Sequence, residues 1–242
     1  MKIRIAIIAA TGSAYKRTIP ALKNSAICEV VAIQARNLDK LKSICSEYAI
    51  PSYFIDEKMM LTKAMYDLIY IANPPFMHFD SIKTAVATGK PIICEKPLDK
   101  DYHSALRYRE LLSNYDSPFM VAHHLRHQQL FLDIKNAIDS GKIGQIQSVF
   151  CQWGFKMNTN ATNAAWKLDP SLSGGGTFSD NGIHIVDFIL GLLSKPKSVF
   201  GHSFSTSDSF EHVFDTETAT LVYPKTTVTL NSSQNMEFPG NH

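Results

Sequence analysis

The feature that most constrains this chain is the alternation of short apolar runs with amphipathic stretches over residues 1–122. The first run, Ile3–Ala9, is apolar apart from Arg4, as expected of a strand buried on both faces of a sheet. Further strands are expected at Glu29–Gln34, Ser52–Phe54, Leu68–Ala72, Pro91–Cys94 and Phe119–Ala122, and helices at Arg17–Asn24, Leu38–Tyr48, Lys58–Ala64, His78–Thr88 and Tyr102–Ser113. Short connections between such elements predict an α/β fold with a doubly wound parallel sheet, whose site lies at the carboxyl ends of the strands.

The pattern changes after Ala122, which predicts a domain boundary between residues 122 and 123. A long helix is expected at Gln128–Ser140, followed by a strand at Ile146–Phe155 in which apolar and polar residues alternate. Later strands are expected at Lys197–Ser203, Thr216–Tyr223 and Thr226–Ser232, without a crossover helix between the last two. This pattern predicts a second domain of α+β type with an open, largely antiparallel sheet.

The last expected strand is followed closely by the end of the sequence at His242. A sheet that ends there exposes an open edge, which natural proteins usually pair or cover. The sequence therefore predicts either a partner at this edge or a chain truncated at its C-terminus.

Composition excludes several classes of protein. With 242 residues, 45% of them hydrophobic, the chain can bury a core and is not expected to be disordered. A net charge of +2 without a basic block argues against nucleic-acid binding. The longest apolar runs, such as Phe188–Leu193, are far shorter than the ~20 residues that span a bilayer, so no membrane segment is expected. Four widely spaced cysteines without a CxxC motif predict no metal site and a cytoplasmic location with reduced thiols.

The loop after the first strand aligns with the dinucleotide fingerprint G-x-G-x-x-G/A as Ala10-x-Gly12-x-x-Tyr15. It keeps only the central glycine, the one that lets phosphates approach the backbone amides at a helix start. Ser13 adds a hydroxyl donor beside it. An ordinary strand-to-helix turn explains the loop equally well.

The second strand is followed by Arg36 and lacks an acidic residue at its end. An acid at this place binds the ribose 2′-hydroxyl of NAD, whereas an arginine suits the 2′-phosphate of NADP. If the loops bind a dinucleotide, NADP(H) is therefore favoured and NAD(H) remains possible. The alternative is a solvated arginine in a loop.

The fourth strand is followed by Asn73 and Pro74, and His78 comes shortly afterwards at an expected helix start. The His78 ring has two interpretations, contact with a nicotinamide ribose or a structural capping role. The capping role is the commoner one for a single histidine.

The fifth strand is followed by Glu95-Lys96-Pro97. A tight loop here aims the Lys96 ammonium into the crevice at the strand ends. A lysine in that place can hold a substrate hydroxyl, and burial would lower its pKa toward the working range. A Glu-Lys pair on the surface without a function is the alternative.

The densest cluster of motifs lies in Ser173–Asp187, where three successive glycines precede Asp180 and His184. Asp180 and His184 are four residues apart and share one face of a helix, with Asp187 three residues further on. A carboxylate beside an imidazole orients the ring and raises its pKa, as a proton-transfer pair requires. A buried His–Asp pair with a purely structural role is the alternative.

Three of these motifs, in this order and spacing, resemble a known family. Glu95-Lys96-Pro97, then Trp166–Pro170, then the glycines with Asp180 and His184 resemble the glucose–fructose oxidoreductase / inositol dehydrogenase / MocA-like (Gfo/Idh/MocA) oxidoreductases. The resemblance runs from Ile3 to about Asn235. It implies an NAD(P)-binding Rossmann domain over 1–122 and a substrate-binding and oligomerisation domain over 123–242, with homo-oligomers formed through the second sheet.

The resemblance also implies roles for single residues. Lys96 would hydrogen-bond the reacting oxygen, His184 would act as general acid/base, and Asp180 would help to place the substrate. The expected cofactor contacts are Gly12, Ser13, Arg36, Asn73, Pro74, His78, Glu95 and Lys96, and Trp166 and Lys167 are expected beside the substrate. No metal is implied. The chain departs from the family in its single fingerprint glycine and in its length, which is short by up to one small domain.

Three functions are therefore open. The leading one is an NAD(P)-dependent oxidoreductase that transfers a hydride between nicotinamide and a hydroxyl or ketone of a sugar, polyol or sugar derivative. The first alternative is a non-catalytic or inactive nucleotide-binding fragment of the same family. The second alternative is an NAD-dependent glycoside hydrolase on the same scaffold.

Overall fold

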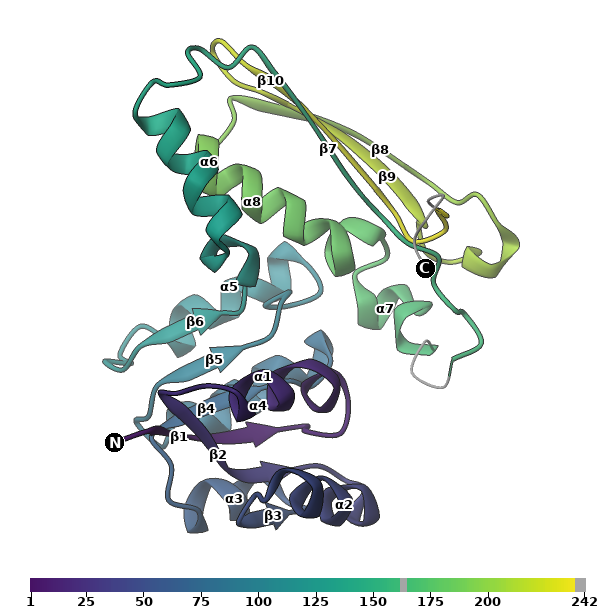
Figure 1. The fold of residues 1–242 in the computed structure, drawn as a ribbon. Helices are drawn as coiled ribbons and strands as arrows, with labels where there is room; N and C mark the ends of the chain where they lie inside the picture. Colours follow the sequence, from purple (N-terminus) through teal and green to yellow (C-terminus); the bar gives the residue numbers. More distant parts are fainter. Residues whose placement is uncertain (162–164, 238–242) are drawn as a thin grey trace. The chain divides into compact units, whose positions relative to one another are not determined.

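The structure is a computed structural model that describes residues 1–161 and 165–237 (Figure 1). The chain divides into two compact units, Met1–Ala122 and His123–His242.

The first unit is built on a six-stranded sheet in the order β3-β2-β1-β4-β5-β6, and all neighbouring strands are parallel. Its strands are β1 Ile3–Ile8, β2 Cys28–Gln34, β3 Ser52–Phe54, β4 Leu68–Ile71, β5 Ile92–Cys94 and β6 Phe119–Val121. Chain order reverses beside β1, so the carboxyl ends of β1 and β4 flank the switch point of a doubly wound sheet. The predicted fold class is confirmed for this unit.

The helices of this unit are α1 Ile19–Lys23, α2 Leu38–Tyr48, α3 Glu57–Lys63, α4 Pro75–Val86 and α5 Tyr102–Leu111. They create two cores, because successive side chains of a strand point to opposite faces. Ile5 and Ile7 of β1 pack with residues of α1 and α2. Ala6 and Ile8 pack with residues of α3, α4 and α5. A strand covered on both faces explains why the first apolar run is continuous rather than alternating.

The first helix begins earlier than the sequence predicts. A π-helical segment, Ala14–Thr18, runs directly into α1, whose second residue is Pro20. Proline cannot donate the main-chain hydrogen bond of a regular helix. It stands where the π-helical segment passes into α1, and such an irregular junction is the kind of place at which a helix accommodates proline.

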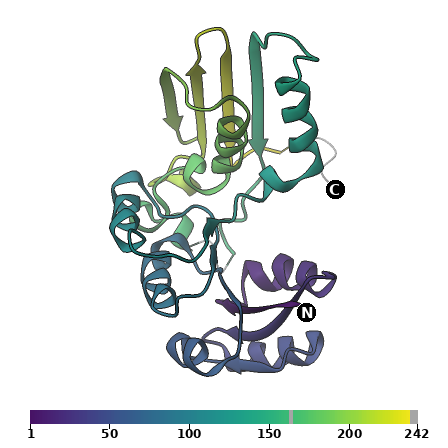
Figure 2. The same ribbon diagram turned by 90° about the vertical axis from the view of Figure 1, so that its left-hand side faces the viewer.

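The second unit contains a four-stranded sheet in the order β7-β10-β9-β8, which Figure 2 shows face on. Its elements are α6 Gln129–Asp139, β7 Ser148–Gly154, α7 Pro170–Ser173, α8 Ile183–Leu193, β8 Ser198–Phe204, β9 Thr216–Val222 and β10 Thr227–Ser233. The pairs β8–β9 and β9–β10 are antiparallel, as predicted, but β10 pairs with β7 in parallel. The connection through α8 returns the chain to the end of the sheet where β7 began, so β8 and β7 run the same way.

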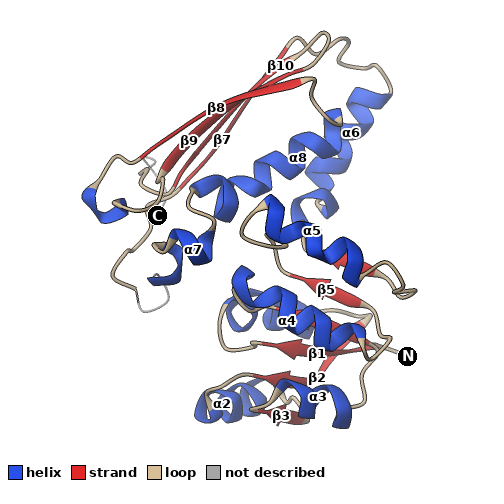
Figure 3. Ribbon diagram, turned by 180° about the vertical axis from the view of Figure 1, so that it is seen from behind, coloured by secondary structure: helices blue, strands red, loops and turns tan. Residues whose placement is uncertain are grey.

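One face of this sheet is covered by α8, with α6 packed beside that helix (Figures 1 and 3). Ile185 and Ile189 of α8 pack against apolar residues of β9 and β10. On the opposite face, one cross-strand row consists of Phe150, Thr229, Thr220 and Phe200. The two phenylalanines are 67% and 66% exposed, so this face carries large apolar side chains in solvent.

Candidate functional site

In the first unit, the predicted cofactor residues lie in loops at the carboxyl ends of four strands. Gly12 and Ser13 follow β1, Arg36 follows β2, Asn73 and Pro74 follow β4, and Glu95 and Lys96 follow β5. These loops are tied together by the main chain, through Ala10 N to Gln34 O at 2.9 Å, Ala72 N to Ile8 O at 3.1 Å and Glu95 N to Ile71 O at 2.9 Å. Because all four strands are parallel, the loops share one edge of the sheet.

Gly12 leaves open space at the start of the first helix. A Cβ atom built on Gly12 would meet nothing within 4 Å, and its φ is not positive, so the fold itself does not require glycine there. Ser13 is exposed, and its hydroxyl makes no capping bond to the helix. The helix start therefore has room for a ligand beside its amide groups.

The strained residue of this loop is Ala9 rather than Gly12. Ala9 has a φ of 60°, in the left-handed region that favours glycine. Its N–H donates to Oε1 of Gln34 at 3.2 Å, and Nε2 of Gln34 donates to the carbonyl of Ile55 at 3.2 Å. The Gln34 side chain therefore holds the turn in this conformation.

We expect Ala9→Gly to raise the free energy of unfolding by about 1 kcal/mol, because it removes the Cβ clash of the left-handed conformation. Ala49→Gly should give a similar gain, since Ala49 has a φ of 55° at the end of α2. Ala87→Gly, at a φ of −61°, should instead lower stability. Chemical denaturation of the three variants measures the effect, and equal losses in all three would contradict it.

Arg36 is exposed directly after Ala35, the buried residue that follows β2. Among the residues that the structure describes, the Arg36 guanidinium makes no ion pair or hydrogen bond. Asn37, the next residue, caps α2 by accepting from Lys40 N at 2.9 Å. The guanidinium is thus available to an anionic ligand at this edge.

Asn73 belongs to a buried network of side-chain hydrogen bonds that the sequence analysis did not predict. Its Nδ2 donates to Ser81 Oγ at 2.7 Å, and that hydroxyl donates to Glu57 Oε2 at 2.9 Å. Within the described residues, Asn73 Oδ1 and Glu57 Oε1 are buried and make no hydrogen bond. Burial is the main cause that raises the pKa of Glu57. Pro74 follows Asn73 and precedes the first residue of α4.

The raised pKa predicts how Glu57→Gln changes stability with pH. A carboxyl whose pKa is higher in the folded chain than its ordinary 4.5 stabilises the fold in its protonated form, and this contribution is lost as pH rises through the folded pKa. Glutamine cannot ionise and still accepts from Ser81. We therefore expect Glu57→Gln to match or exceed the parent melting temperature at pH 7 and to weaken its decline between pH 4.5 and pH 7.

The control for this variant is Glu110→Gln, which alters an exposed carboxylate on α5. It should leave the pH dependence of the melting temperature unchanged. A Glu57→Gln variant that is much less stable than the parent at pH 7 would contradict the interpretation, because the ionised carboxylate would then be stabilising.

His78 lies at the start of α4, and its ring contacts two main-chain carbonyl groups. The residue is 0% exposed. Its Nε2 lies 2.8 Å from the carbonyl oxygen of Asn73, and its Nδ1 lies 3.2 Å from that of Leu98. Burial is the main cause that lowers the His78 pKa, which favours the neutral ring. The ring thus ties the loop after β4 to the loop after β5, as the capping interpretation predicts, and its predicted contact with a cofactor stays a prediction.

The loop that carries Lys96 is fixed at both ends. At one end, Tyr70 OH donates to Glu95 Oε1 at 2.5 Å, and Lys96 N donates to Glu95 Oε2 at 3.2 Å. Burial is the main cause that raises the pKa of Tyr70, so the phenol stays protonated as the donor. The Lys96–Pro97 peptide bond is cis.

At the other end of this loop, Tyr108 OH donates to the Leu98 carbonyl at 3.1 Å. The buried carboxylate of Asp99 accepts from Arg107 Nη2 at 2.8 Å. The Arg107 guanidinium also lies 4.0 Å from the centroid of the Phe79 ring. These contacts hold the main chain of the loop in place on both sides of Lys96.

In the second unit, the structure brings three predicted site residues together. Lys167 Nζ donates to Asp180 Oδ2, and Asn181 Nδ2 donates to the same oxygen at 2.8 Å. The Lys167 ammonium lies 5.5 Å from the centroid of the Trp166 ring. A cation, a carboxylate, an amide and an aromatic ring therefore form one cluster between the segment Ala165–Lys167 and the turn that leads into α8.

His184, in the first turn of α8, is 7% exposed and lies between two other rings. Its ring centroid is 5.3 Å from that of Trp153 and 5.0 Å from that of His124. Asp187, predicted near the same side of the helix, binds Arg126 instead, with Arg126 Nε 2.7 Å from Asp187 Oδ2. The Arg126 side chain thus serves an internal ion pair, and the ring stack surrounds His184.

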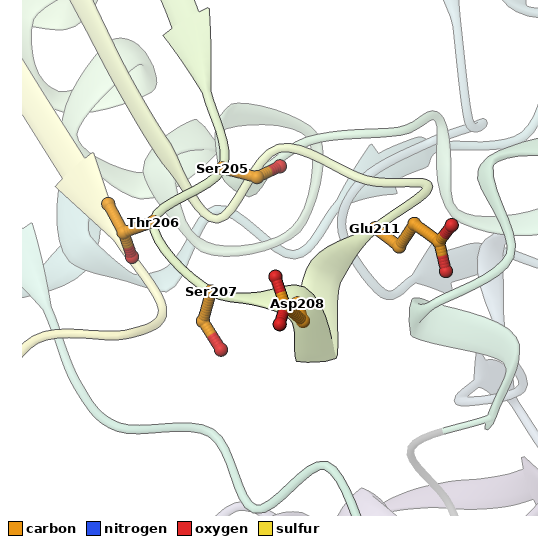
Figure 4. Close-up of a pocket in the computed structure, with 5 residues that line it drawn as sticks. All are labelled: Ser205, Thr206, Ser207, Asp208 and Glu211. Atoms are coloured by element: carbon orange, nitrogen blue, oxygen red, sulfur yellow. The ribbon is translucent and has the colours of Figure 1, made fainter.

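A hollow of about 450 Å³ lies elsewhere in this unit (Figure 4). It is lined by Ser205, Thr206, Ser207, Asp208 and Glu211, in the connection from β8 to β9. None of these five is a predicted site residue. Thr206 donates from both N and Oγ1 to the buried Asp215, which ties this connection to the start of β9.

Within residues 1–161 and 165–237, no group of three or more His, Cys, Asp or Glu side chains is arranged to hold a metal ion. Over the same residues, no helix has the length and hydropathy of a membrane span.

Sequence reasoning missed the residues that anchor the loops. They are Gln34, Glu57, Tyr70 and Ser81 in the first unit and Glu217 in the second. Gln34 and Tyr70 carry a detectable signal, because each places polar atoms in an otherwise apolar strand. The others could be found only from contacts between elements distant in sequence.

Comparison with known proteins identifies two family domains. Residues 3–123 match the oxidoreductase family described as NAD-binding Rossmann fold, and residues 131–241 match the GFO/IDH/MocA C-terminal domain. Together these two matches cover most of the chain.

Individual relatives are distant. The chain is 28% identical to an oxidoreductase of Formosa agariphila over 201 residues, which are 82% of this chain and 63% of that protein. It is 26% identical to D-xylose 1-dehydrogenase [NADP(+)] of Haloarcula marismortui over 218 residues, which are 88% of this chain and 61% of that protein. The chain therefore spans about six tenths of the length of these curated relatives.

A solved structure shows the same fold. The WlbA dehydrogenase of Bordetella pertussis, in complex with NADH and UDP-GlcNAcA, superposes with a TM-score of 0.86 at 21% identity, covering 100% of this chain and 73% of that one. With both units matched by the family's own domains, the chain belongs to the GFO/IDH/MocA oxidoreductase family, with an NAD(P)-binding Rossmann domain.

Proposed function

We propose that the protein is an NADP(H)-preferring oxidoreductase that transfers a hydride between nicotinamide and a hydroxyl or ketone of a sugar, polyol or sugar derivative. The observation that carries the proposal is the set of four loops at one edge of the parallel sheet. They combine open space at Gly12, an available guanidinium at Arg36 and a braced lysine at Lys96. Such an edge is where doubly wound sheets bind dinucleotides.

The residues of this edge fit the pyrophosphate and the 2′-phosphate of NADP. The space beside Gly12 and the exposed Ser13 fit a pyrophosphate at a helix start. Arg36 fits the 2′-phosphate, and the neutral Ala35 beside it offers no carboxylate to a ribose hydroxyl. Asn73, Pro74, Glu95 and Lys96 are the proposed contacts toward the nicotinamide end. When bound, the cofactor supplies or accepts the hydride.

The residues of this chain handle the oxygen and its proton. Lys96 hydrogen-bonds the reacting oxygen and stabilises charge that develops on it. His184 takes the hydroxyl proton during oxidation and returns it during reduction, a step that typically contributes about 10²–10⁴-fold to the rate. The rings of Trp153 and His124 hold the imidazole in place.

The second unit is the proposed binding site for the sugar-like substrate. Asp180, held by Lys167 and Asn181, places hydroxyl groups, and the Trp166 ring offers an apolar face to a sugar ring. Relatives that act on D-xylose or hold a sugar nucleotide support this class of substrate.

Assembly and location follow the same resemblance. We propose a homo-oligomer formed through the open face of the second sheet, where Phe150 and Phe200 are exposed. A cytoplasmic location is proposed with it. Sedimentation of the purified chain tests the assembly, and a monomer at all concentrations would count against it.

A turnover assay distinguishes the three candidate functions. Purified protein is mixed with NADPH and a panel of ketoses, sugar lactones and oxidised sugar nucleotides, separately with NADP and the matching alcohols, and separately with NAD and simple glycosides. Net cofactor consumption with one of them supports the oxidoreductase. Glycoside cleavage without net cofactor turnover would support the hydrolase. Cofactor binding without either reaction would support a non-catalytic protein.

A further inference from the structure

The three glycines before α8, Gly174, Gly175 and Gly176, are required for different structural reasons. Gly174 and Gly175 have φ values of 85° and 87°, in the region that favours glycine. Gly176 has no positive φ, yet a Cβ atom built on it would lie 2.5 Å from Oε2 of Glu217. Its missing side chain therefore makes room for one carboxylate.

That carboxylate caps the segment that carries Asp180 and His184. Glu217 is on β9, and its Oε2 accepts from Phe178 N at 2.5 Å. Its Oε1 accepts from Ser203 Oγ on β8 at 2.8 Å. Phe178 begins the π-helical segment Phe178–Gly182, which runs directly into α8. A carboxylate on a free amide at a helix start both satisfies the donor and complements the helix dipole.

The same segment also contacts β10 through side chains. Thr177 Oγ1 and Ser232 Oγ lie 2.9 Å apart, and both residues are 0% exposed. A Cβ atom on Gly182 would come within 2.9 Å of the Ser232 side chain. The segment therefore lies directly on the sheet, and Glu217 is the charged group that holds its first amide.

We infer that Glu217 is a positioning residue for this site: through Phe178 N it sets the place of Asp180 and His184. The inference rests on the proposed function, which gives those two side chains their roles. Asp180 is the third residue of the capped segment, and His184 lies in the turn that follows. A shift of the first amide moves both side chains relative to a substrate, and a displacement of about 1 Å can cost about 100-fold in rate.

A double-mutant cycle tests the inference. Gly176→Ala displaces the carboxylate and Glu217→Ala removes it, so each variant should lower kcat by about 10- to 100-fold. The KM for NADPH should stay at the parent value, because the proposed cofactor residues lie in the other unit. The double variant should be no slower than Glu217→Ala alone, because the added methyl group then meets no carboxylate.

Two further variants serve as controls. Gly201→Ala places a Cβ at an ordinary 3.4 Å from the nearest atom on the adjacent strand, and its kcat should equal that of the parent. Glu217→Gln retains one oxygen that accepts from Phe178 N, so it should recover part of the kcat lost in Glu217→Ala. An unchanged kcat in Gly176→Ala and Glu217→Ala, with only a lower melting temperature, would overturn the inference.

A spectroscopic readout separates this inference from the proposed function. In a Trp166→Phe background, Trp153 is the only indole, and its ring contacts His184. Glu217→Ala, Gly176→Ala and the double variant should shift the Trp153 emission by the same amount, whereas Gly201→Ala should not. If the parent shows no turnover, the proposed function fails while this shift still tests the cap. An emission unchanged in all variants would then refute it.

Discussion

Replacing His184 with alanine is expected to lower kcat by about 100- to 10,000-fold while leaving the affinity for NADPH unchanged. His184 is 7% exposed and its imidazole lies between the rings of Trp153 and His124, and an alanine at this position carries no group that can move a proton. Single-turnover kinetics with saturating NADPH measure the effect directly. Turnover equal to that of the parent would end the assignment of His184 as acid/base.

Two control variants make the His184 result interpretable. His184→Gln retains a polar side chain without the proton-transfer function, and it should be as slow as His184→Ala while leaving a smaller void. His202→Ala removes an exposed histidine on β8 and should leave kcat unchanged. A loss in His184→Ala that His184→Gln fully restores would show that the ring has only a packing role.

Replacing Lys96 with methionine is expected to lower kcat by about 100- to 1,000-fold. Methionine keeps an unbranched side chain that is one atom shorter, but it lacks the charge and the N–H donors that would bind the reacting oxygen. The loop itself should persist, because Tyr70, Tyr108 and Arg107 hold it through Glu95, Leu98 and Asp99.

Lys90→Met is the matched control for Lys96→Met. Lys90 is exposed in the turn before β5, so this variant should retain the parent rate and melting temperature. A Lys96→Met variant that retains full kcat would contradict the proposed role. A variant that loses NADPH binding but retains the rate of the chemical step would show that Lys96 binds the cofactor and not the reacting oxygen.

Much of the first unit could be predicted because its hydrophobic patterns are each compatible with only one kind of secondary structure and burial. A continuous apolar run such as Ile3–Ile8 must be covered on both faces, and the structure places alternate side chains in two separate cores. Because the carboxyl ends of parallel strands meet at one edge of a sheet, the loops of Gly12, Arg36, Asn73 and Lys96 could be predicted to lie together there. Their proposed contacts with a cofactor stay predictions.

The direction of strand pairing in the second unit was only partly predictable. Alternation in β7 and β10 shows that each has one buried face, but it contains no information about the neighbour's direction. The parallel pairing of β7 with β10 follows from the long connection through α8, which only the assembled fold reveals.

The anchoring of the site depends on contacts between distant residues. Glu217 and Phe178 are 39 residues apart, and nothing in either local sequence indicates that one caps the other. Helical spacing alone likewise put Asp187 near His184, whereas the structure pairs Asp187 with Arg126, 61 residues earlier in the chain. A charge elsewhere in the fold can outcompete a neighbour on the same helix.

The measurement that tests the central claim most directly is a fluorescence titration of the folded chain with NADPH and with NADH. The proposal predicts saturable binding of both, with NADPH at least about tenfold tighter, which corresponds to about 1.4 kcal/mol. Arg36→Ala should remove this preference without weakening NADH binding. Absence of binding by either cofactor, in a sample shown to be folded by circular dichroism, would contradict the account of the loop edge and favour a non-catalytic protein.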